Sequence, residues 1–192
     1  MSQLAPLSGS YAGDRGGEVE LSRSEPFHDQ FVRLFEAHFP RLFRYLNRLS
    51  GDRELAADLA QEAFVRLYRR GALPDTPGPW LVSVALNLFR NERSTRSRRL
   101  RLLTPARGER IQGDPPAAPE QAALAEDSRR RVRRVLERLP EREQSLLLLR
   151  AEGFSYREMA QALRVKEGSV GVLLARARRS FRAIYEEEFH AP

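Results

Sequence analysis

The sequence contains no cysteine, which excludes disulfide bonds, thiolate metal sites and cysteine nucleophiles. Its three histidines, His28, His38 and His190, lack the spacing of metal ligands. No apolar run approaches the ~20 residues that span a bilayer, and the N-terminal residues lack the apolar core of a secretory signal. We therefore expect a soluble, cytoplasmic protein with no metal, no cofactor and no membrane insertion.

Lysine is nearly absent as well, because arginine supplies all but one of the 33 basic side chains and Lys166 is the exception. The formal net charge is +7, and 31% of the residues are charged. Arginine keeps its charge and presents a planar fork of donors that fits phosphates and base edges. Nucleic acid is therefore the first partner to consider, although a basic composition can also simply keep a protein soluble.

Charge, glycine and proline divide the chain into segments. The predicted segments are a disordered tail (1–26), a first domain (27–103), a flexible linker (104–128), a second domain (129–185) and a short tail (186–192). The first tail is rich in glycine and serine. The linker is predicted from three prolines within six residues and from the absence of basic residues around them. Both domains carry most of the periodic apolar residues.

Both domains are predicted to be all-α, because apolar residues recur at helical spacing and no alternating strand pattern occurs. In the first domain we expect a helix over residues 31–49, with Pro40 predicting a break or kink. Asp52 is a candidate N-cap for a second helix. Glycines and prolines over residues 71–79 indicate a loop, and a third helix runs from about Trp80 into a cluster of arginines.

The second domain contains the pattern of a helix-turn-helix. Gly153 ends one helix, and Ser155 with Glu158 forms a capping box for the next, short helix. After a tight turn the final helix begins around residues 167–169, and small Ala160 suits a close crossing of the two helices. In such a pair the second helix can enter the major groove of DNA while the first crosses the backbone. The alternative is a three-helix bundle that uses the same periodicity for its core alone.

Five stretches of the sequence resemble segments of one known family. They are Asp58–Tyr68 (DLAQEAFVRLY), Trp80–Leu88 (WLVSVALNL), Leu139–Glu143 (LPERE), Gly153–Ala160 (GFSYREMA) and Gly168–Val170 (GSV). In this order they resemble the extracytoplasmic-function (ECF) type of sigma factor in the sigma-70 family. The resemblance implies a region 2-like domain and a region 4-like helix-turn-helix domain joined by a flexible linker. It also implies a protein that is not an enzyme and that directs RNA polymerase to promoters.

The resemblance implies protein partners and their binding residues. Core RNA polymerase would be bound at its beta-prime clamp by Asp58, Gln61, Glu62 and Arg66, and also at its beta flap. A solvated acidic helix face is the alternative for these side chains. An anti-sigma factor is a further implied partner. Because this chain has no cysteine, any redox or zinc sensing would reside in that partner.

Promoter DNA is the other implied partner. The residues assigned to it are Trp80, Asn87, Arg90, Asn91, Arg93, Arg96, Arg98 and Arg99 in the first domain, and Ser155, Tyr156, Lys166, Glu167, Ser169, Arg176, Arg178 and Arg179 in the second. Asn87 and the loop over residues 71–79 would hold a flipped base of the melted strand. The arginines from residue 90 would follow phosphates, with a solvated basic tail as their alternative. For Trp80 we favour a place in the core over a stacking surface.

The sequence departs from the family at several positions. Arg164 stands where the turn usually has glycine, and Asn91 in the first domain stands where aspartate is common. Gly171, Val172 and Leu173 replace basic or polar residues of the recognition helix, and their side chains make no hydrogen bonds to bases. Upstream-element recognition would then rest on phosphate contacts and DNA shape. Alternatively, exposed Val172 and Leu173 would form part of a protein interface.

Three rival functions deserve comparison. A free-standing DNA-binding regulator would not need the stretch Asp58–Tyr68. A DNA recombinase or invertase would need a catalytic α/β domain, and the first half of the chain shows no strand pattern. An RNA-binding adaptor would need an aromatic-bearing sheet, which the pattern does not predict. Direct binding to core polymerase distinguishes the sigma-factor hypothesis from the first rival.

Overall fold

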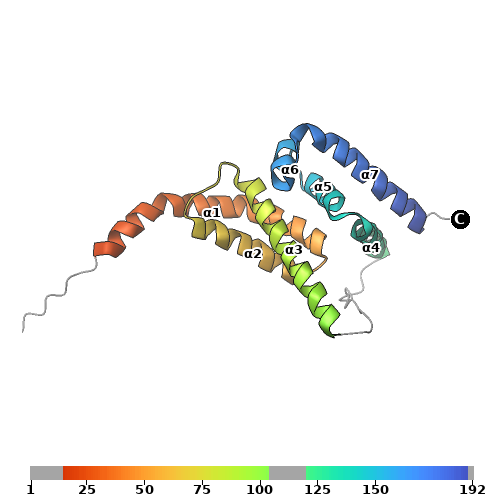
Figure 1. The fold of residues 1–192 in the computed structure, drawn as a ribbon, viewed down its shortest axis with the longest axis horizontal. Helices are drawn as coiled ribbons and strands as arrows, with labels where there is room; N and C mark the ends of the chain where they lie inside the picture. The colour runs from red at the N-terminus through yellow and green to blue at the C-terminus, as the bar shows by residue number, and fades with distance from the viewer. Residues whose placement is uncertain (1–14, 104–119, 190–192) are drawn as a thin grey trace, which may run out of the picture.

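A computed structural model describes residues 15–103 and 120–189, with side chains for 27–98 and 127–189. Over the described residues the chain is helical and contains no strand, so the predicted all-α class is confirmed. Three helices form a first bundle and four form a second, which lies beside it (Figure 1). None of the helices in this part of the chain is both long and apolar enough to cross a membrane.

The first bundle consists of α1 (Arg15–Ser50), α2 (Arg53–Arg70) and α3 (Pro77–Leu103). Asp52 caps α2 as predicted, since its side chain accepts a hydrogen bond from the Leu55 backbone N at 3.0 Å. Gly71 ends α2 with φ of 68°, a left-handed conformation that suits glycine. The three helices bury a shared leucine-rich core, which fixes the exposed faces of α2 and α3.

Prolines interrupt this bundle less than the sequence predicts. Helix α1 begins at Arg15 and continues through Pro26 and Pro40. Of the break or kink predicted at Pro40, the break does not occur, and residues 15–26 are helical where a disordered tail was predicted. Pro40 is exposed and loses one helical hydrogen bond, while Leu42 and Tyr45 just after it are buried, and that burial favours continuing the helix. Residues 1–14 of the predicted tail lie outside the described residues.

The loop before α3 is also shorter than predicted. Helix α3 begins at Pro77, so the expected loop over residues 71–79 ends at residue 76. The backbone N of Trp80 donates to the Thr76 carbonyl oxygen at 3.1 Å, as in a first helical turn. The first four N–H groups of a helix have no intrahelical partner, so Pro77 and Pro79 cost nothing there.

The second bundle consists of α4 (Glu120–Arg138), α5 (Glu141–Ala151), α6 (Tyr156–Leu163) and α7 (Glu167–Phe189). Sequence analysis missed α4, which begins inside the predicted linker, so that linker is wrong over residues 120–128. The alanine, glutamate and leucine of that stretch are strong helix formers, whereas the prolines end at residue 119. Helix α7 also runs four residues into the predicted C-terminal tail. Residues 104–119 lie outside the described residues.

The predicted helix-turn-helix is formed by α6 and α7. Ser155 Oγ accepts from the Glu158 backbone N at 3.2 Å, and Glu158 Oε2 accepts from the Ser155 backbone N at 2.7 Å, which completes the capping box. Arg164 forms the turn with φ of 54°, the only non-glycine residue at positive φ in the described chain. Met159 and Leu174 are buried in the core that the two helices share. The turn therefore carries backbone strain at an arginine.

We expect Arg164→Gly to raise the free energy of unfolding by about 0.5–1 kcal/mol, because glycine adopts positive φ without strain. Urea unfolding followed by circular dichroism measures the change. Arg157→Gly is the matched control, because Arg157 is an exposed arginine within α6, where glycine costs up to about 1 kcal/mol. Equal losses for both variants would show that the turn is not strained.

Candidate nucleic-acid and protein interfaces

One face of α2 carries all four residues that the sequence assigned to polymerase binding. Asp58 and Gln61 are exposed, and Glu62 is half-buried one helical turn beyond Asp58. Arg66 Nε donates to Glu62 Oε1 at 2.8 Å across a further turn. An exposed pair of this kind contributes only about 0.3–0.5 kcal/mol. Both side chains can therefore leave each other for a partner at little cost.

An aromatic groove lies along the edge of this face, between α1 and α2. Phe31 and Phe35 of α1 meet Phe64 and Tyr68 of α2, with ring centres 5.1 Å apart for Phe31–Tyr68 and 4.9 Å for Phe35–Phe64. The groove has a volume of about 420 Å³. Gln61, which shares the acidic face of α2 with Asp58 and Glu62, also lines the groove. Tyr68 is 50% exposed and Phe35 37% exposed. The sequence predicted a helix over residues 31–49 but did not reveal this exposed groove.

Helix α3 carries buried apolar residues in its first part and exposed polar and basic residues further along. Leu81, Ala85 and Phe89 are buried. Most of the residues assigned to the melted promoter strand are exposed, namely Asn87, Arg90, Asn91, Arg93, Arg96 and Arg98. The side chain of Arg99 lies outside the described residues. Trp80 is partly buried against the core, the place that the sequence analysis favoured for it.

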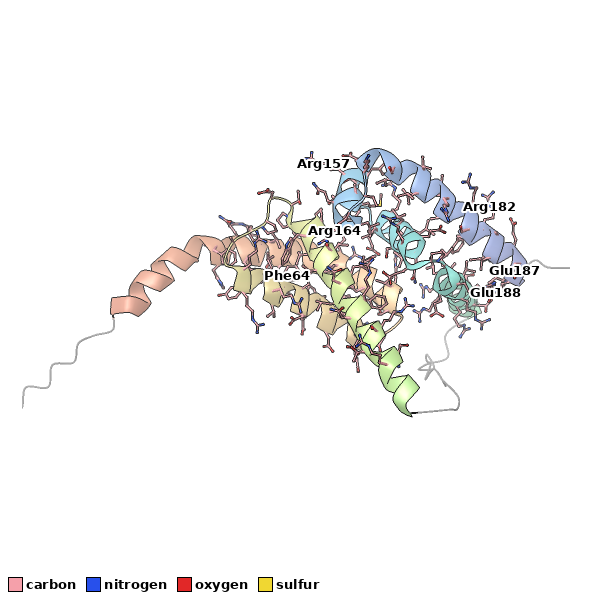
Figure 2. All side chains as sticks on the ribbon, viewed as in Figure 1. Phe64, Arg157, Arg164, Arg182, Glu187 and Glu188 are labelled. Atoms are coloured by element: carbon pink, nitrogen blue, oxygen red, sulfur yellow. The ribbon has the colours of Figure 1, made fainter. Side chains whose placement is uncertain are left out.

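The second set of assigned DNA residues surrounds the helix-turn-helix. Lys166, Glu167, Arg176, Arg178 and Arg179 are exposed, and Ser169 is partly buried. Tyr156 is 42% exposed. The Ser155 hydroxyl is held by Glu158 in the capping box, and Arg176 Nε lies 3.1 Å from Glu143 Oε1. Figure 2 shows Arg157 on α6 and Arg164 in the turn that follows α6, with Phe64 in the other bundle.

The apolar residues Val172 and Leu173 of α7, the second helix of the helix-turn-helix and hence its recognition helix, differ in exposure. Val172 is 72% exposed, whereas Leu173 is partly buried and packs against the core. The expectation that both are exposed is therefore wrong for Leu173. Gly171 faces Tyr156, since a Cβ at Gly171 would lie 3.6 Å from the Tyr156 ring.

Comparison with known families accounts for both bundles. The family described as Sigma-70 region 2 matches residues 34–99, and Sigma-70, region 4 matches residues 129–181. The ECF RNA polymerase sigma factor SigL of Mycobacterium tuberculosis is 31% identical over 80% of this chain and 88% of its own length. This chain belongs to the ECF group of sigma-70 factors. The resemblance inferred from the sequence motifs is thus confirmed.

Other relatives of this sigma factor differ in how far the match extends. The ECF sigma factor SigE of Mycolicibacterium smegmatis is 34% identical, and the match covers 82% of this chain but 61% of SigE. The sigma-H factor of Pseudomonas aeruginosa is 33% identical over 68% of this chain and 73% of its own length. The chain therefore spans under two thirds of the SigE relative.

Two solved structures share the fold of this sigma factor. One is the sigma factor RpoE in complex with the anti-sigma factor NepR from Bartonella quintana, with a TM-score of 0.62 and 19% identity, covering 83% of this chain and 98% of that one. The other is CnrH in complex with the cytosolic domain of CnrY, with a TM-score of 0.59 and 20% identity, covering 88% of this chain and 95% of that one.

The two domains of this sigma factor meet where α1 packs against the segment between α5 and α6. The Glu152 side chain is 3% exposed, and its carboxylate lies 2.9 Å from both Arg44 Nε and Arg48 Nη1. Arg41 Nε donates to the Glu152 carbonyl oxygen at 2.9 Å. The Arg41 guanidinium also lies 3.4 Å from the centre of the Phe154 ring, a cation–π contact. Sequence analysis assigned no role to these five residues.

Two arginines of α3 also take part in the domain interface. Arg90 Nε lies 2.6 Å from Glu141 Oε1, and Arg93 Nη1 lies 3.9 Å from Glu141 Oε2. Two arginines assigned to promoter DNA thus have a carboxylate of the second domain as their partner.

Tyr45 of α1 is fully buried near this interface, and burial raises the pKa of its hydroxyl to about 12.

His38 lies at the junction of α1, α3 and α6. A Cβ at Gly78 of α3 would come within 3.0 Å of the His38 ring. Burial lowers the pKa of His38, Arg41 lowers it further, and Glu158 of α6 opposes them. For Glu158 itself, burial raises the pKa, but the hydrogen bonds from Ser155 and the charge of Arg41 outweigh it and hold the pKa below its ordinary value. The interface therefore favours neutral His38 and ionised Glu158.

We expect Glu152→Gln to lower the free energy of unfolding by about 1–3 kcal/mol, because it leaves two arginines without their carboxylate. Urea unfolding measures this loss. The same variant should move the domains apart, which fluorescence transfer between dyes at Arg69→Cys and Glu186→Cys detects in this otherwise cysteine-free chain. Glu187→Gln is the matched control, since Glu187 pairs with Arg138 but is 67% exposed. A Glu152→Gln effect no larger than the control's would contradict the interface.

His38 makes stability depend on pH. The pKa of His38 is lowered in the folded chain from its ordinary value of 6.5. Its contribution to stability is therefore fully present above pH 6.5 and is lost as the pH falls through the lowered pKa of the folded chain. The free energy of unfolding should therefore decrease between about pH 7.5 and about pH 5.5. His38→Gln should flatten this slope, and His28→Gln, at an exposed position on the same helix, should leave it unchanged. Identical slopes in both variants would assign the effect elsewhere.

Proposed function

We propose that this sigma factor binds core RNA polymerase through α2 and promoter DNA through α3 and α7, and so directs transcription initiation without catalysing any reaction itself. The observation that supports this most is the separation of surfaces. The acidic face and aromatic groove lie on α1 and α2, and the arginines assigned to DNA lie on α3 and α7. Because different helices carry them, polymerase and DNA can be bound at the same time, in the cytoplasm where both are found.

Polymerase binding would use two complementary parts of the first domain. The aromatic groove offers apolar area that gains free energy when a partner helix covers it. Asp58, Gln61 and Glu62 beside it offer acceptors for charge-assisted hydrogen bonds from basic side chains of the clamp. Arg66 would exchange Glu62 for a carboxylate of the partner. The apolar groove then supplies affinity and the acidic face supplies orientation. A further contact between the second domain and the beta flap belongs to the same proposal.

DNA binding would use the exposed arginines of α3 for phosphates of the melted strand and those of α7 for the upstream duplex. Asn87 lies exposed beside Arg90, whose Nη1 donates to Asn87 Oδ1 at 3.4 Å. An amide in that place can read the edge of an unstacked base. The bond to Arg90 is long, so the Asn87 amide can turn toward a nucleotide.

DNA and the second domain compete for α3. Arg90 and Arg93 hold Glu141 in this arrangement, so a phosphate must replace that carboxylate before either arginine contacts DNA. Promoter binding on polymerase would therefore separate the domains. An anti-sigma factor would keep them together, a role in keeping with the RpoE structure of the same fold, which is a complex with the anti-sigma factor NepR.

The experiment is run-off transcription with core polymerase on fragments of the source genome. We expect initiation at discrete start sites, and we expect Asp58→Ala/Glu62→Ala to weaken it at least tenfold, since two charge-assisted contacts of about 1 kcal/mol or more are lost. Glu36→Ala is the control, because Glu36 is an exposed carboxylate of the same domain on α1, outside the acidic face of α2.

A pull-down of core polymerase completes the test. Weaker capture of polymerase by the double variant, with DNA binding retained, assigns the acidic face to polymerase. DNA binding by the wild-type chain without initiation or polymerase capture would overturn the proposal and leave the free-standing regulator in its place.

A further inference from the structure

The recognition helix presents one isolated apolar side chain to solvent. Val172 is 72% exposed, the largest exposed fraction among the large apolar side chains of the described residues. Helical spacing places Gly168, Ala175, Arg176 and Arg179 on the same face, and all four are exposed. Because Gly168 and Ala175 carry at most one methyl group, nothing overhangs Val172. Its two methyl groups stand clear of the helix surface.

Folding does not explain valine at this position. The buried residues of α7 are Val170, Leu174 and Ala177. Valine is a weaker helix former than alanine, and its exposed methyl groups gain nothing from the folded chain. Val172 is thus available to an external partner, whereas Leu173 is held by the core.

Charge around Val172 indicates which partner fits. Arg179 follows it on the same face, and Lys166 precedes it at the turn, both exposed. Arg176 is exposed as well, but its Nε lies 3.1 Å from Glu143 Oε1. Cations on both sides of an apolar point suit the phosphates on the two sides of a DNA groove. The first half of the second helix is also the part of a helix-turn-helix that meets base edges. An apolar protein surface would instead have to desolvate these cations.

In the major groove the apolar group that distinguishes bases is the C5-methyl group of thymine. We propose that Val172 recognises a thymine of the upstream promoter element through contact with this methyl group, while Lys166 and Arg179 fix the helix on phosphates. The proposal rests on promoter binding by α7. It replaces hydrogen-bond readout, which Gly171, Val172 and Leu173 cannot provide, with a contact between methyl groups.

The test removes the thymine methyl group and nothing else. Holoenzyme made from the full chain and core polymerase selects duplexes from a randomised pool. Each thymine of the selected sequence is then replaced singly by uracil, which keeps the same hydrogen-bonding edge. We expect one or two replacements to weaken wild-type binding about fourfold, the factor for one buried methyl group. Val172→Ala should lose this sensitivity, and Val172→Thr, which keeps a methyl group, should retain part of it.

Val132→Ala is the matched control, because Val132 is an exposed valine on α4 and should leave the uracil effect unchanged. Uracil effects that are equal in the wild type and in Val172→Ala, or absent from both, would overturn the inference while leaving promoter binding intact. Failure of the holoenzyme to select any sequence would overturn the proposed promoter binding as well. Circular dichroism of each variant confirms that α7 is still formed.

Discussion

The arrangement of the whole chain depends on one buried carboxylate. Glu152 lies between Arg44 and Arg48 with its side chain almost fully covered. A carboxylate removed from water costs several kcal/mol unless cations and hydrogen bonds replace the water, so this contact is stable only when α1 and the α5–α6 segment meet. Arg41 adds a bond to the Glu152 carbonyl and a guanidinium over the Phe154 ring. Once these contacts form, α3 lies against α6 and Glu141 reaches Arg90.

The nature of the cation matters in this contact. Arg41 uses its planar guanidinium for two tasks at once, a hydrogen bond at its Nε and a stacked contact with an aromatic ring. A lysine ammonium offers neither the flat face nor a fixed fork of donors. Almost all basic residues of this chain are arginine, and the same property serves carboxylates inside the protein and phosphates outside it. Arg90 and Arg93 therefore can exchange one partner for the other with similar geometry.

Sequence reasoning succeeded where structure is determined by neighbouring residues. The N-cap at Asp52 and the capping box of Ser155 and Glu158 connect residues three apart, so the pattern can be read directly. It overestimated proline, because the cost of one lost hydrogen bond at Pro40 is smaller than the gain from burying the residues around it. It also gave the first part of α4, residues 120–128, to the linker, since the nearby prolines outweighed helix propensity in that interpretation.

In the candidate sites too, features set by spacing along one helix were predictable, and contacts between separate helices were not. Spacing along a helix placed Asp58, Gln61 and Glu62 on one face, as the structure has them. The aromatic groove and the domain interface join residues from separate helices, up to 117 positions apart for Arg41 and Glu158. No local pattern encodes such pairs. The interface thus adds what the sequence could not supply, namely that residues assigned to DNA already have a partner within the chain.

The recognition helix shows why exposure has to be read side chain by side chain. Val172 and Leu173 are adjacent and chemically alike, yet a helical rotation of 100° between neighbours sends one to solvent and the other to the core. The sequence suggested a protein interface at Val172 and Leu173, but only Val172 is exposed, and cations lie around it. One isolated methyl-bearing side chain is too small an area for a stable protein contact. It is the right size for one thymine methyl group, and the surrounding cations then supply most of the affinity while Val172 supplies the choice of base.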